Sequence, residues 1–142
     1  MKLVKHLLDA KGADVVSVDE DMSVYDAIAL MAERSIGSLL VMNGEELKGI
    51  VTERDYARKV ILKGRSSETT PVGEVMSTAV ITAAPEQTVD ECMALMTERR
   101  IRHLPVVAGN RVVGLISIGD LVQAIISDQQ EAIEHLENYI SG

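Results

Sequence analysis

Apolar residues follow two spacings along the chain, and together they predict short strands alternating with helices. Residues 38–42 and 47–52 are rich in branched side chains, which favour strands, and the Asn-Gly pair at 43–44 between them is typical of a hairpin turn. The stretch before them instead places its apolar residues on one helical face, namely Val24, Ala27, Ile28 and Met31. The pattern therefore predicts a mixed α/β protein.

The first half of the chain predicts five main elements after a lead-in helix. Ser23 and Asp26 have the spacing of a capping box, so a helix is expected to begin there. The full expected order is a helix at residues 2–10, a strand at 15–18, a helix from 23 to about 34, strands at 38–42 and 47–52, and a helix from Asp55 to about 62.

The second half repeats the first. The segment 49–55 recurs 65 positions later as 114–120, and each copy reads as glycine, apolar strand end, hydroxyl, two variable residues and aspartate. Thr88 and Glu91 repeat the capping box, while residues 80–82 and 72–76 repeat the first strand and the lead-in helix. Such recurrence indicates an internal duplication.

The duplication predicts an α/β (α+β) fold of tandem repeats. Each repeat is expected to be a small mixed three-stranded sheet with helices, and the two are expected to pack with pseudo-twofold symmetry because one such unit buries too little surface alone. The expected divisions are a first repeat with its lead-in helix at 1–64, a linker at 65–71, a second repeat at 72–127 and a C-terminal helical tail at 128–142.

The tail allows two interpretations. Its apolar residues recur at intervals of seven, with Gln129 and Leu136 at the intermediate positions, in the series Ile126, Ile133 and Ile140. The tail is either an extension laid over its own domain or a short helix-to-helix dimer seam with a polar layer at Gln129.

Charge and composition exclude several functions. The formal net charge of -8 and the pI of about 4.8 disfavour nucleic acids and anionic membranes as partners. No apolar run reaches membrane-spanning length, and the charged first twelve residues do not resemble a signal peptide. The single Cys92 is interpreted as a buried thiol. We therefore expect a soluble, cytoplasmic protein.

The duplicated turn places a hydroxyl and a carboxylate where a strand passes into a helix. The pairs are Thr52 with Asp55 and Ser117 with Asp120. Helix starts favour anions such as phosphate, so a polar ligand at two related sites is one interpretation. Because the same spacing is also a plain capping box, a structural role without any ligand is the other.

The chain resembles a pair of CBS domains, also called a Bateman module, of the stand-alone bacterial or organellar type. The resemblance rests on the two turns, on Arg-His-Leu-Pro-Val at 102–106, and on the helix starts Val-Tyr-Asp-Ala and Val-Asp-Glu-Cys. It extends from about residue 3 to residue 126. Such modules usually dimerise as a flat disc and bind AMP, ADP or ATP, with NAD(H) or S-adenosylmethionine in some relatives.

The resemblance implies a role for each matching residue. Asp55 and Asp120 are implied to bind ribose hydroxyls, and Thr52 and Ser117 to lie on the phosphate side. The residues implied for the adenine pocket are Ser17, Val18, Thr82, Leu104 and Pro105.

Cations near the turns differ between the copies. Arg102 and His103 stand where the first copy has Gly37 and Ser38, and Arg54 stands where the second has Gly119. Because guanidinium groups bind phosphate well, we expect two unequal sites, although each charge alone is more simply a solvated side chain. For Arg58, Lys59, Lys63 and Arg65, balancing the acidic surface is favoured over phosphate binding. No metal site is expected at His6 or His135.

Three functions remain in competition at this stage. The leading one is a sensor of adenine nucleotides that acts as a homodimer and signals through a partner protein. The second is a structural dimerisation module with degenerate sites. The third, disfavoured because the sequence contains no evident catalytic set, is an enzyme acting on nucleotides.

Overall fold

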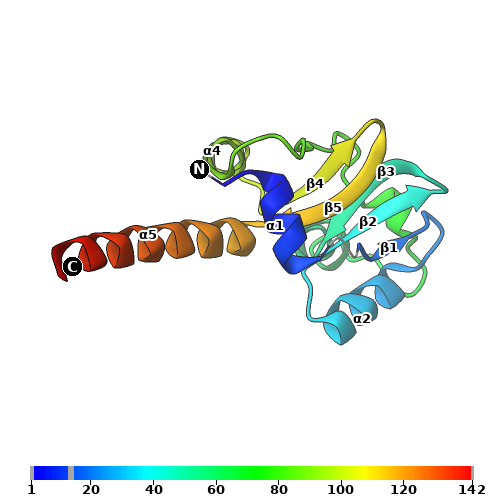
Figure 1. Cartoon of the computed structure of the whole chain (residues 1–142). Helices are drawn as coiled ribbons and strands as arrows, with labels where there is room; N and C mark the ends of the chain where they lie inside the picture. The colour runs from blue at the N-terminus through cyan, green and yellow to red at the C-terminus, as the bar shows by residue number, and fades with distance from the viewer. Residues whose placement is uncertain (1, 13–14, 142) are drawn as a thin grey trace. The chain divides into compact units, whose positions relative to one another are not determined.

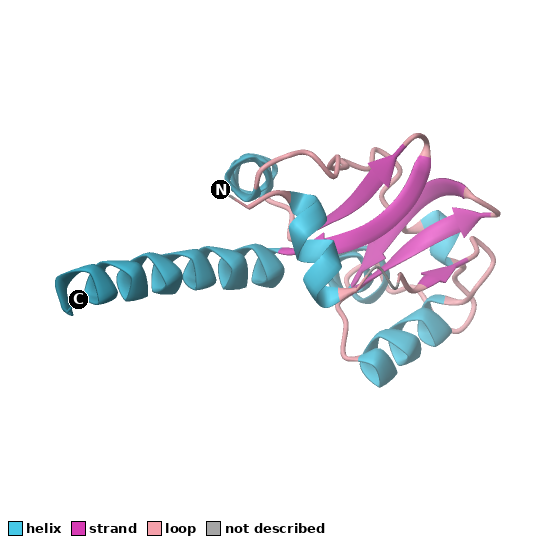
Figure 2. Ribbon diagram, viewed as in Figure 1, coloured by secondary structure: helices cyan, strands magenta, loops and turns pink. Residues whose placement is uncertain are grey.

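Strands and helices alternate through the computed structural model, which describes residues 2–12 and 15–141 (Figures 1 and 2). The order is α1 (Val4–Lys11), β1 (Ser17–Val18), α2 (Val24–Arg34), β2 (Ser38–Asn43), β3 (Glu46–Thr52), α3 (Glu53–Tyr56), the π-helix η1 (Ala57–Ile61), the 3₁₀-helix η2 (Val72–Glu74), α4 (Val89–Arg99), β4 (His103–Ala108), β5 (Arg111–Ser117) and α5 (Ile118–Ser141). The predicted mixed α/β fold class is confirmed.

The chain divides into two compact units. The first-repeat unit contains residues 15–81 and 109–112. The second-repeat unit contains the described residues of segments 1–14, 82–108 and 113–142. The lead-in helix α1 therefore belongs to the same unit as α4 and most of the β4–β5 hairpin, although it precedes the first repeat in the sequence.

The first-repeat unit contains a three-stranded mixed sheet in the order β1-β2-β3. β1 pairs with β2 in parallel, and β2 pairs with β3 antiparallel, with a register shift between Val41 and Met42. The hairpin loop consists of Gly44 and the following residue, because Asn43 still pairs with Glu46. Gly44 has φ 63°, which a glycine adopts without strain, so the turn lies one residue later than the sequence pattern predicts.

The core of this unit lies between the sheet and its helices. Ser23 caps α2 as expected by accepting a hydrogen bond from the N–H of Asp26 at 3.1 Å. The apolar face of α2 then packs with the strands and with residues that follow the linker. The buried cluster comprises Val18, Val24, Ala27, Met31, Leu39, Val41, Val51, Val60, Val72 and Val75.

The second-repeat unit contains the antiparallel pair β4–β5 and departs from the first at its opening strand. The prediction of a strand at 80–82 is wrong, because the described segment makes a single parallel bridge between Ala83 and Val106. The Ala84 N–H donates instead to the side chain of Gln87 at 2.7 Å, and Pro85 has no N–H to donate. These two residues end the pairing after Ala83.

The lead-in segments are exchanged between the repeats. Val4 N–H donates to the Gln87 carbonyl at 2.8 Å, and Val89 N–H donates to the Lys2 carbonyl at 3.0 Å. The same pair of bonds recurs in the first-repeat unit, from Val72 to Met22 at 2.8 Å and from Val24 to Thr70 at 2.8 Å. Each unit is thus completed by the lead-in of the other repeat.

Two predicted helix boundaries need correction. The helix expected to open at Asp55 begins at Glu53, because Thr52 is its N-cap and Asp55 is the third helical residue. The lead-in expected at 72–76 is a 3₁₀-helix over Val72–Glu74 rather than an α-helix.

The last helix, α5, runs for 24 residues and confirms the predicted helical tail. Its first turns pack on α4 and bury Leu121 and Ala124. Every residue from 129 to 141 is exposed, so the interpretation that the tail lies over its own domain is wrong for these residues. No helix within the described residues is long and apolar enough to span a bilayer.

We predict that alanine at the two repeated glycines has unequal effects. A Cβ at Gly49 would lie 2.7 Å from the Ser77 backbone carbonyl and from the sulfur of Met76, whereas one at Gly114 would lie 2.5 Å from a terminal methyl of Leu8. The leucine end can rotate away and the carbonyl cannot. Gly49→Ala should therefore cost about 1–3 kcal/mol, and Gly114→Ala less. Thermal unfolding of both variants measures this, and equal losses would contradict it.

Candidate functional site

The first turn forms at the junction of β3 and α3. The Thr52 N–H and hydroxyl both donate to Asp55 Oδ2, at 2.9 and 3.1 Å, and the Asp55 N–H donates to Thr52 Oγ1 at 3.2 Å. Asp55 is buried, and its carboxylate accepts both hydrogen bonds from Thr52. The reciprocal bonds satisfy backbone donors at the helix start, so the capping interpretation of this motif is geometrically correct.

The second turn has the same geometry at the junction of β5 and α5. The Ser117 N–H donates to Asp120 Oδ2 at 2.8 Å, and the Asp120 N–H donates to Ser117 Oγ at 3.2 Å. The Asp120 side chain retains 26% of its exposure, against 11% for Asp55. The second carboxylate is therefore the more accessible of the two.

Each carboxylate also meets a lysine, and the two lysines come from different elements. Lys59, one helical turn after Asp55, lies 3.0 Å from Oδ1 and donates to the Val75 carbonyl at 2.8 Å. Lys11, at the end of α1, lies 2.6 Å from Asp120 Oδ2 and donates to the Leu115 carbonyl at 2.9 Å. We call these contacts the lysine clips.

The Lys11 clip changes the acidity of Asp120. Burial alone would raise the pKa of this carboxyl group. The hydrogen bond and charge of Lys11, together with the hydrogen bonds from Ser117, outweigh that effect and hold the Asp120 pKa below its ordinary value. Asp120 therefore stays ionised into more acidic solution than a free aspartate does.

Arg102 lies beside the second turn. Its carbonyl accepts a 2.8 Å hydrogen bond from the N–H of Ile118, the first residue of α5, and His103 follows it at the start of β4. In the first copy the Gly37 carbonyl accepts the corresponding bond from Glu53 at 3.2 Å. The same backbone contact therefore brings an arginine and a histidine to the second turn, and a glycine and a serine to the first.

The residues assigned to the adenine pocket fall into two groups by unit. In the second-repeat unit, Thr82 precedes Ala83, which bonds through its N–H to the Pro105 carbonyl at 2.9 Å, and Leu104 is fully buried. In the first-repeat unit, Ser17 is exposed while Val18 packs in the core. Arg54 is an exposed residue between Thr52 and Asp55.

Sequence analysis missed the part played by lysine. The sequence interpretation gives Lys59 only a role in balancing the acidic surface, whereas Lys59 pairs with the Asp55 carboxylate itself. The i,i+4 spacing of the two residues could have predicted this ion pair. Lys11 is 109 positions from Asp120, so no local pattern could connect them. Arg65 does balance an acidic residue, because it pairs with Glu74 at 2.5 Å.

Other chemically reactive side chains have structural surroundings. Cys92 is fully buried in α4, and burial together with the neighbouring Glu91 raises its thiol pKa, which lowers its reactivity. His6 Nδ1 accepts the Leu3 N–H at 3.0 Å. Within residues 2–12 and 15–141, no cluster of three or more His, Cys, Asp or Glu side chains is arranged to hold a metal ion.

Comparison with known proteins gives consistent matches. The family model described as the CBS domain matches residues 7–62 and again residues 72–127. The mitochondrial CBS domain-containing protein CBSX3 of Arabidopsis thaliana is 45% identical over 127 residues, covering 86% of this chain and 62% of that protein. The chain thus spans less than two thirds of the plant protein. The CBS domain-containing protein YhcV of Bacillus subtilis is 33% identical, with 85% and 86% covered.

Solved structures extend the comparison. A putative signal-transduction protein with CBS domains from Burkholderia ambifaria superimposes with a TM-score of 0.87 at 55% identity, covering 90% of this chain and 96% of that one. The CBS domain pair of protein MJ0100, in complex with 5′-methylthioadenosine and S-adenosyl-L-methionine, superimposes with a TM-score of 0.80 at 25% identity, covering 90% and 98%.

Removing the Lys11 clip should raise the pKa of Asp120. In the parent protein the lowered pKa contributes stability above about pH 3.9, the value for a free aspartate, and this contribution is lost as the pH falls through the folded-state pKa. In Lys11→Met the folded-state pKa should rise toward or past that value, so the stability that the ionised carboxylate contributes above it should be smaller than in the parent protein. A carboxyl-carbon NMR titration measures the pKa directly.

Lys48→Met is the matched control, because Lys48 pairs with Glu46 on the surface of the other unit. An Asp120 pKa that is unchanged in Lys11→Met, or that moves equally in the control, would show that the clip does not set it.

Proposed function

Because this chain belongs to the CBS domain family, with two copies in tandem, we propose that it is a regulatory module that binds an adenine nucleotide and has no catalytic activity of its own. The observation that carries the proposal is the duplicated turn, in which a strand end places a carboxylate and a hydroxyl at a helix start in both copies. Both the family assignment and the hydrogen-bonding chemistry of the turn support it.

Asp55 and Asp120 are proposed to bind the ribose hydroxyls. An ionised carboxylate offers about four lone-pair directions, so hydrogen bonds within the turn leave acceptor capacity for a diol. Asp120 is the better candidate because its side chain is more exposed than that of Asp55. A ribose that approaches Asp120 would share or replace the contact with Lys11.

The phosphate side is proposed to be formed by Thr52 and Ser117 with the neighbouring cations Arg54, Arg102 and His103. Positive groups are needed there because the whole chain carries a net charge of -8. The bond from Ile118 to Arg102 supports a more cationic second site, and Arg54 is the corresponding candidate at the first. We accordingly propose unequal sites, with the second better suited to a phosphate.

The residues proposed to contact adenine are Ser17 and Val18 of the first-repeat unit, and Thr82, Leu104 and Pro105 of the second-repeat unit. Val18 and Leu104 are buried, so their contribution would come mainly through the backbone, while Ser17 and Thr82 are exposed. Backbone donors and acceptors at strand ends discriminate the edge of a purine without requiring aromatic side chains, which are rare in this chain.

The ligand is proposed to be AMP, ADP, ATP or NAD(H), with S-adenosylmethionine a less favoured candidate. The MJ0100 complex contains two compounds that share an adenosine group, which supports adenosine as the common element. The module is proposed to act as a cytoplasmic homodimer whose ligand-dependent arrangement is recognised by a partner protein. Such a ligand shifts the equilibrium only by its different affinities for the two arrangements.

The competing function is a structural dimerisation module in which the turns are only helix caps. The reciprocal hydrogen bonds in both turns favour it, because they account for the motif without a ligand. A test must therefore separate loss of a cap from loss of a ligand contact.

Asp120→Ala should weaken nucleotide binding by roughly 10- to 150-fold, because loss of a charged hydrogen bond costs on the order of 1.5–3 kcal/mol. A thermal-shift panel of AMP, ADP, ATP, NAD⁺, NADH and S-adenosylmethionine first identifies the ligand. Calorimetric titration then compares the parent protein with Asp55→Ala and Asp120→Ala.

Glu91→Ala is the matched control, since Glu91 and Thr88 form the same capping box at the start of α4. It should lower the melting temperature and leave the dissociation constant unchanged. If the aspartate variants behave as Glu91→Ala does, or if no adenine compound binds, the turns are caps and the structural function is favoured.

A further inference from the structure

Helix α5 presents an apolar face that the rest of its unit leaves uncovered. Beyond Ala124 its large apolar side chains are exposed, by 43% at Ile126, 54% at Ile133, 62% at Leu136 and 82% at Ile140. An exposed helical stripe of this kind marks an interaction surface. We call residues 126–140 of this face the α5 seam.

The α5 seam has the spacing of a two-stranded coiled coil. With Ile126 at heptad position a, Ile133 and Ile140 fall at a, and Gln129 and Leu136 fall at d. β-branched residues at a with leucine at d favour two strands in parallel. The stripe therefore fits one partner helix of similar apolar pattern.

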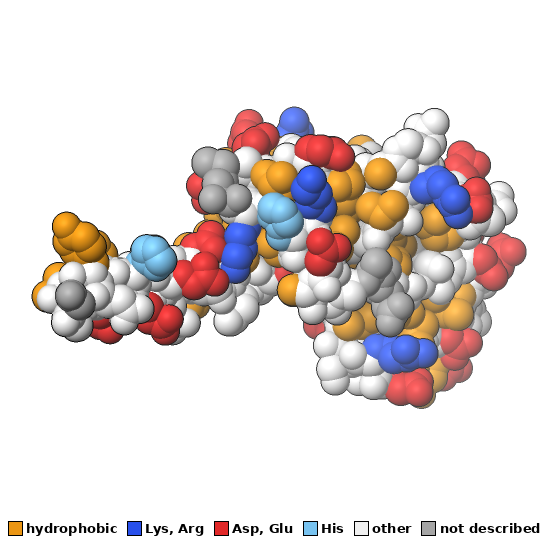
Figure 3. Space-filling view, in the orientation of Figure 1, with side chains coloured by type: hydrophobic (Ala, Val, Ile, Leu, Met, Phe, Trp, Pro, Cys, Tyr) orange, Lys and Arg blue, Asp and Glu red, His pale blue; other side chains and the backbone are white. Residues whose placement is uncertain are grey.

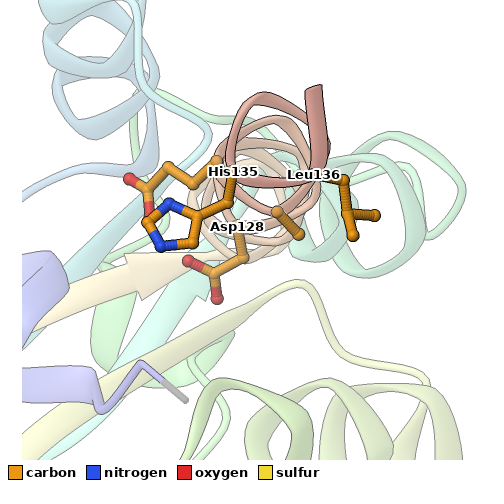
Figure 4. Close-up of a pocket in the computed structure, with 5 residues that line it drawn as sticks. Asp128, His135 and Leu136 are labelled. Atoms are coloured by element: carbon orange, nitrogen blue, oxygen red, sulfur yellow. The ribbon is translucent and has the colours of Figure 1, made fainter. Parts of the chain in front are cut away.

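Charged residues avoid the α5 seam. Asp128, Glu131 and Glu134 occupy the outer positions c, f and b, Glu137 lies at position e beside the seam, and no lysine or arginine follows Arg111 in the sequence. Figure 3 shows acidic side chains gathered over α5, with hydrophobic atoms at its far end. Viewed along the helix, Asp128 and His135 lie on one side and Leu136 projects from the other (Figure 4).

The acidic outer face of α5 and the shape of its surface disfavour two kinds of binding partner for the α5 seam. A membrane surface is disfavoured, because helices that lie on anionic bilayers carry a basic polar face and this one is acidic. A shallow hollow on α5 is lined by Asp128, Glu131, Ala132, His135 and Leu136, all from the one helix. It encloses no space between elements, so a buried small molecule is also disfavoured.

We propose that the α5 seam pairs with the α5 seam of a second copy of this chain, in parallel and in register. Identical positions then face each other about a twofold axis, as an isologous contact requires. The two Gln129 amides oppose one another and can exchange hydrogen bonds. An antiparallel pairing of Ile133 with Leu136 would instead set Gln129 against Ile140 and leave the amide without a partner.

Cysteine cross-linking of the full-length chain tests both the occupant and the register. Gln129→Cys should form an intermolecular disulfide under mild oxidation at least tenfold faster than Glu131→Cys, whose side chain lies at the outer position f. Cys92 gives little background in either variant because it is fully buried. Equal rates would overturn the proposal even if the chain sediments as a dimer, since the dimer would then form elsewhere.

A second pair of substitutions tests the seam by charge. Added to Gln129→Cys, Leu136→Glu should reduce the cross-linking rate at least tenfold, whereas Asn138→Glu, at outer position f, should leave it within twofold. Both sites are exposed, and circular dichroism checks that the helix is retained. An equal effect of the two glutamates would show that general charge repulsion, and not the seam, controls the contact.

Discussion

Backbone hydrogen bonds between exchanged lead-in segments are the constraint on which the rest of the structure depends. Val4 and Val89 make them in one unit, and Val72 and Val24 make the same pair in the other. Because each lead-in completes the helix start of the other repeat, each compact unit draws on both halves of the sequence. A repeat separated from its counterpart would therefore lose a partner strand segment and expose backbone groups that are costly to leave unsatisfied. The two repeats therefore depend on each other for their folded structure.

A reciprocal cap, in which a hydroxyl and a carboxylate three residues apart each accept the other residue's backbone N–H, occurs in three places with different surroundings. At α2 the Ser23 hydroxyl accepts from the Asp26 N–H. At α4 the reciprocal cap is exposed and joins Thr88 and Glu91. At the two duplicated turns it follows a strand and meets a lysine. The hydrogen bonds of the cap are common to all three, so they cannot distinguish a ligand site. What sets the two turns apart from the cap at α4 is the preceding strand that positions each of them and the lysine that each carboxylate contacts.

Periodicity and duplication predicted the helices of the two repeats and the β2–β3 and β4–β5 hairpins, because these depend on local spacing and repeat across 65 positions. The family was predicted from the resemblance of particular motifs, namely the two turns, Arg-His-Leu-Pro-Val at 102–106 and the two helix starts. The strand predicted at 80–82 was wrong, since branched side chains alone do not show which residues pair, and the pairing in this segment is a single bridge at Ala83. The Ala84 N–H, which donates to Gln87, and Pro85, which has no N–H, keep the pairing from continuing past Ala83. Exchange of the lead-ins and the Lys11 contact were also beyond prediction, because both join residues far apart in the chain. The adenine and ribose assignments are still predictions.

In both turns the aspartate carboxylate is already in contact with a lysine ammonium group of the same chain. If ribose binds at Asp55 or Asp120 as proposed, its hydroxyls would compete with an ammonium group of the same chain, whose local concentration does not fall on dilution. Lys59 belongs to the same helical segment as Asp55, so its displacement would be a local event. Lys11 ends α1, so filling the turn at Asp120 would release one end of that helix. The strength of the Lys11–Asp120 contact would then help to set the nucleotide concentration at which the site fills, and release of the end of α1 would accompany binding.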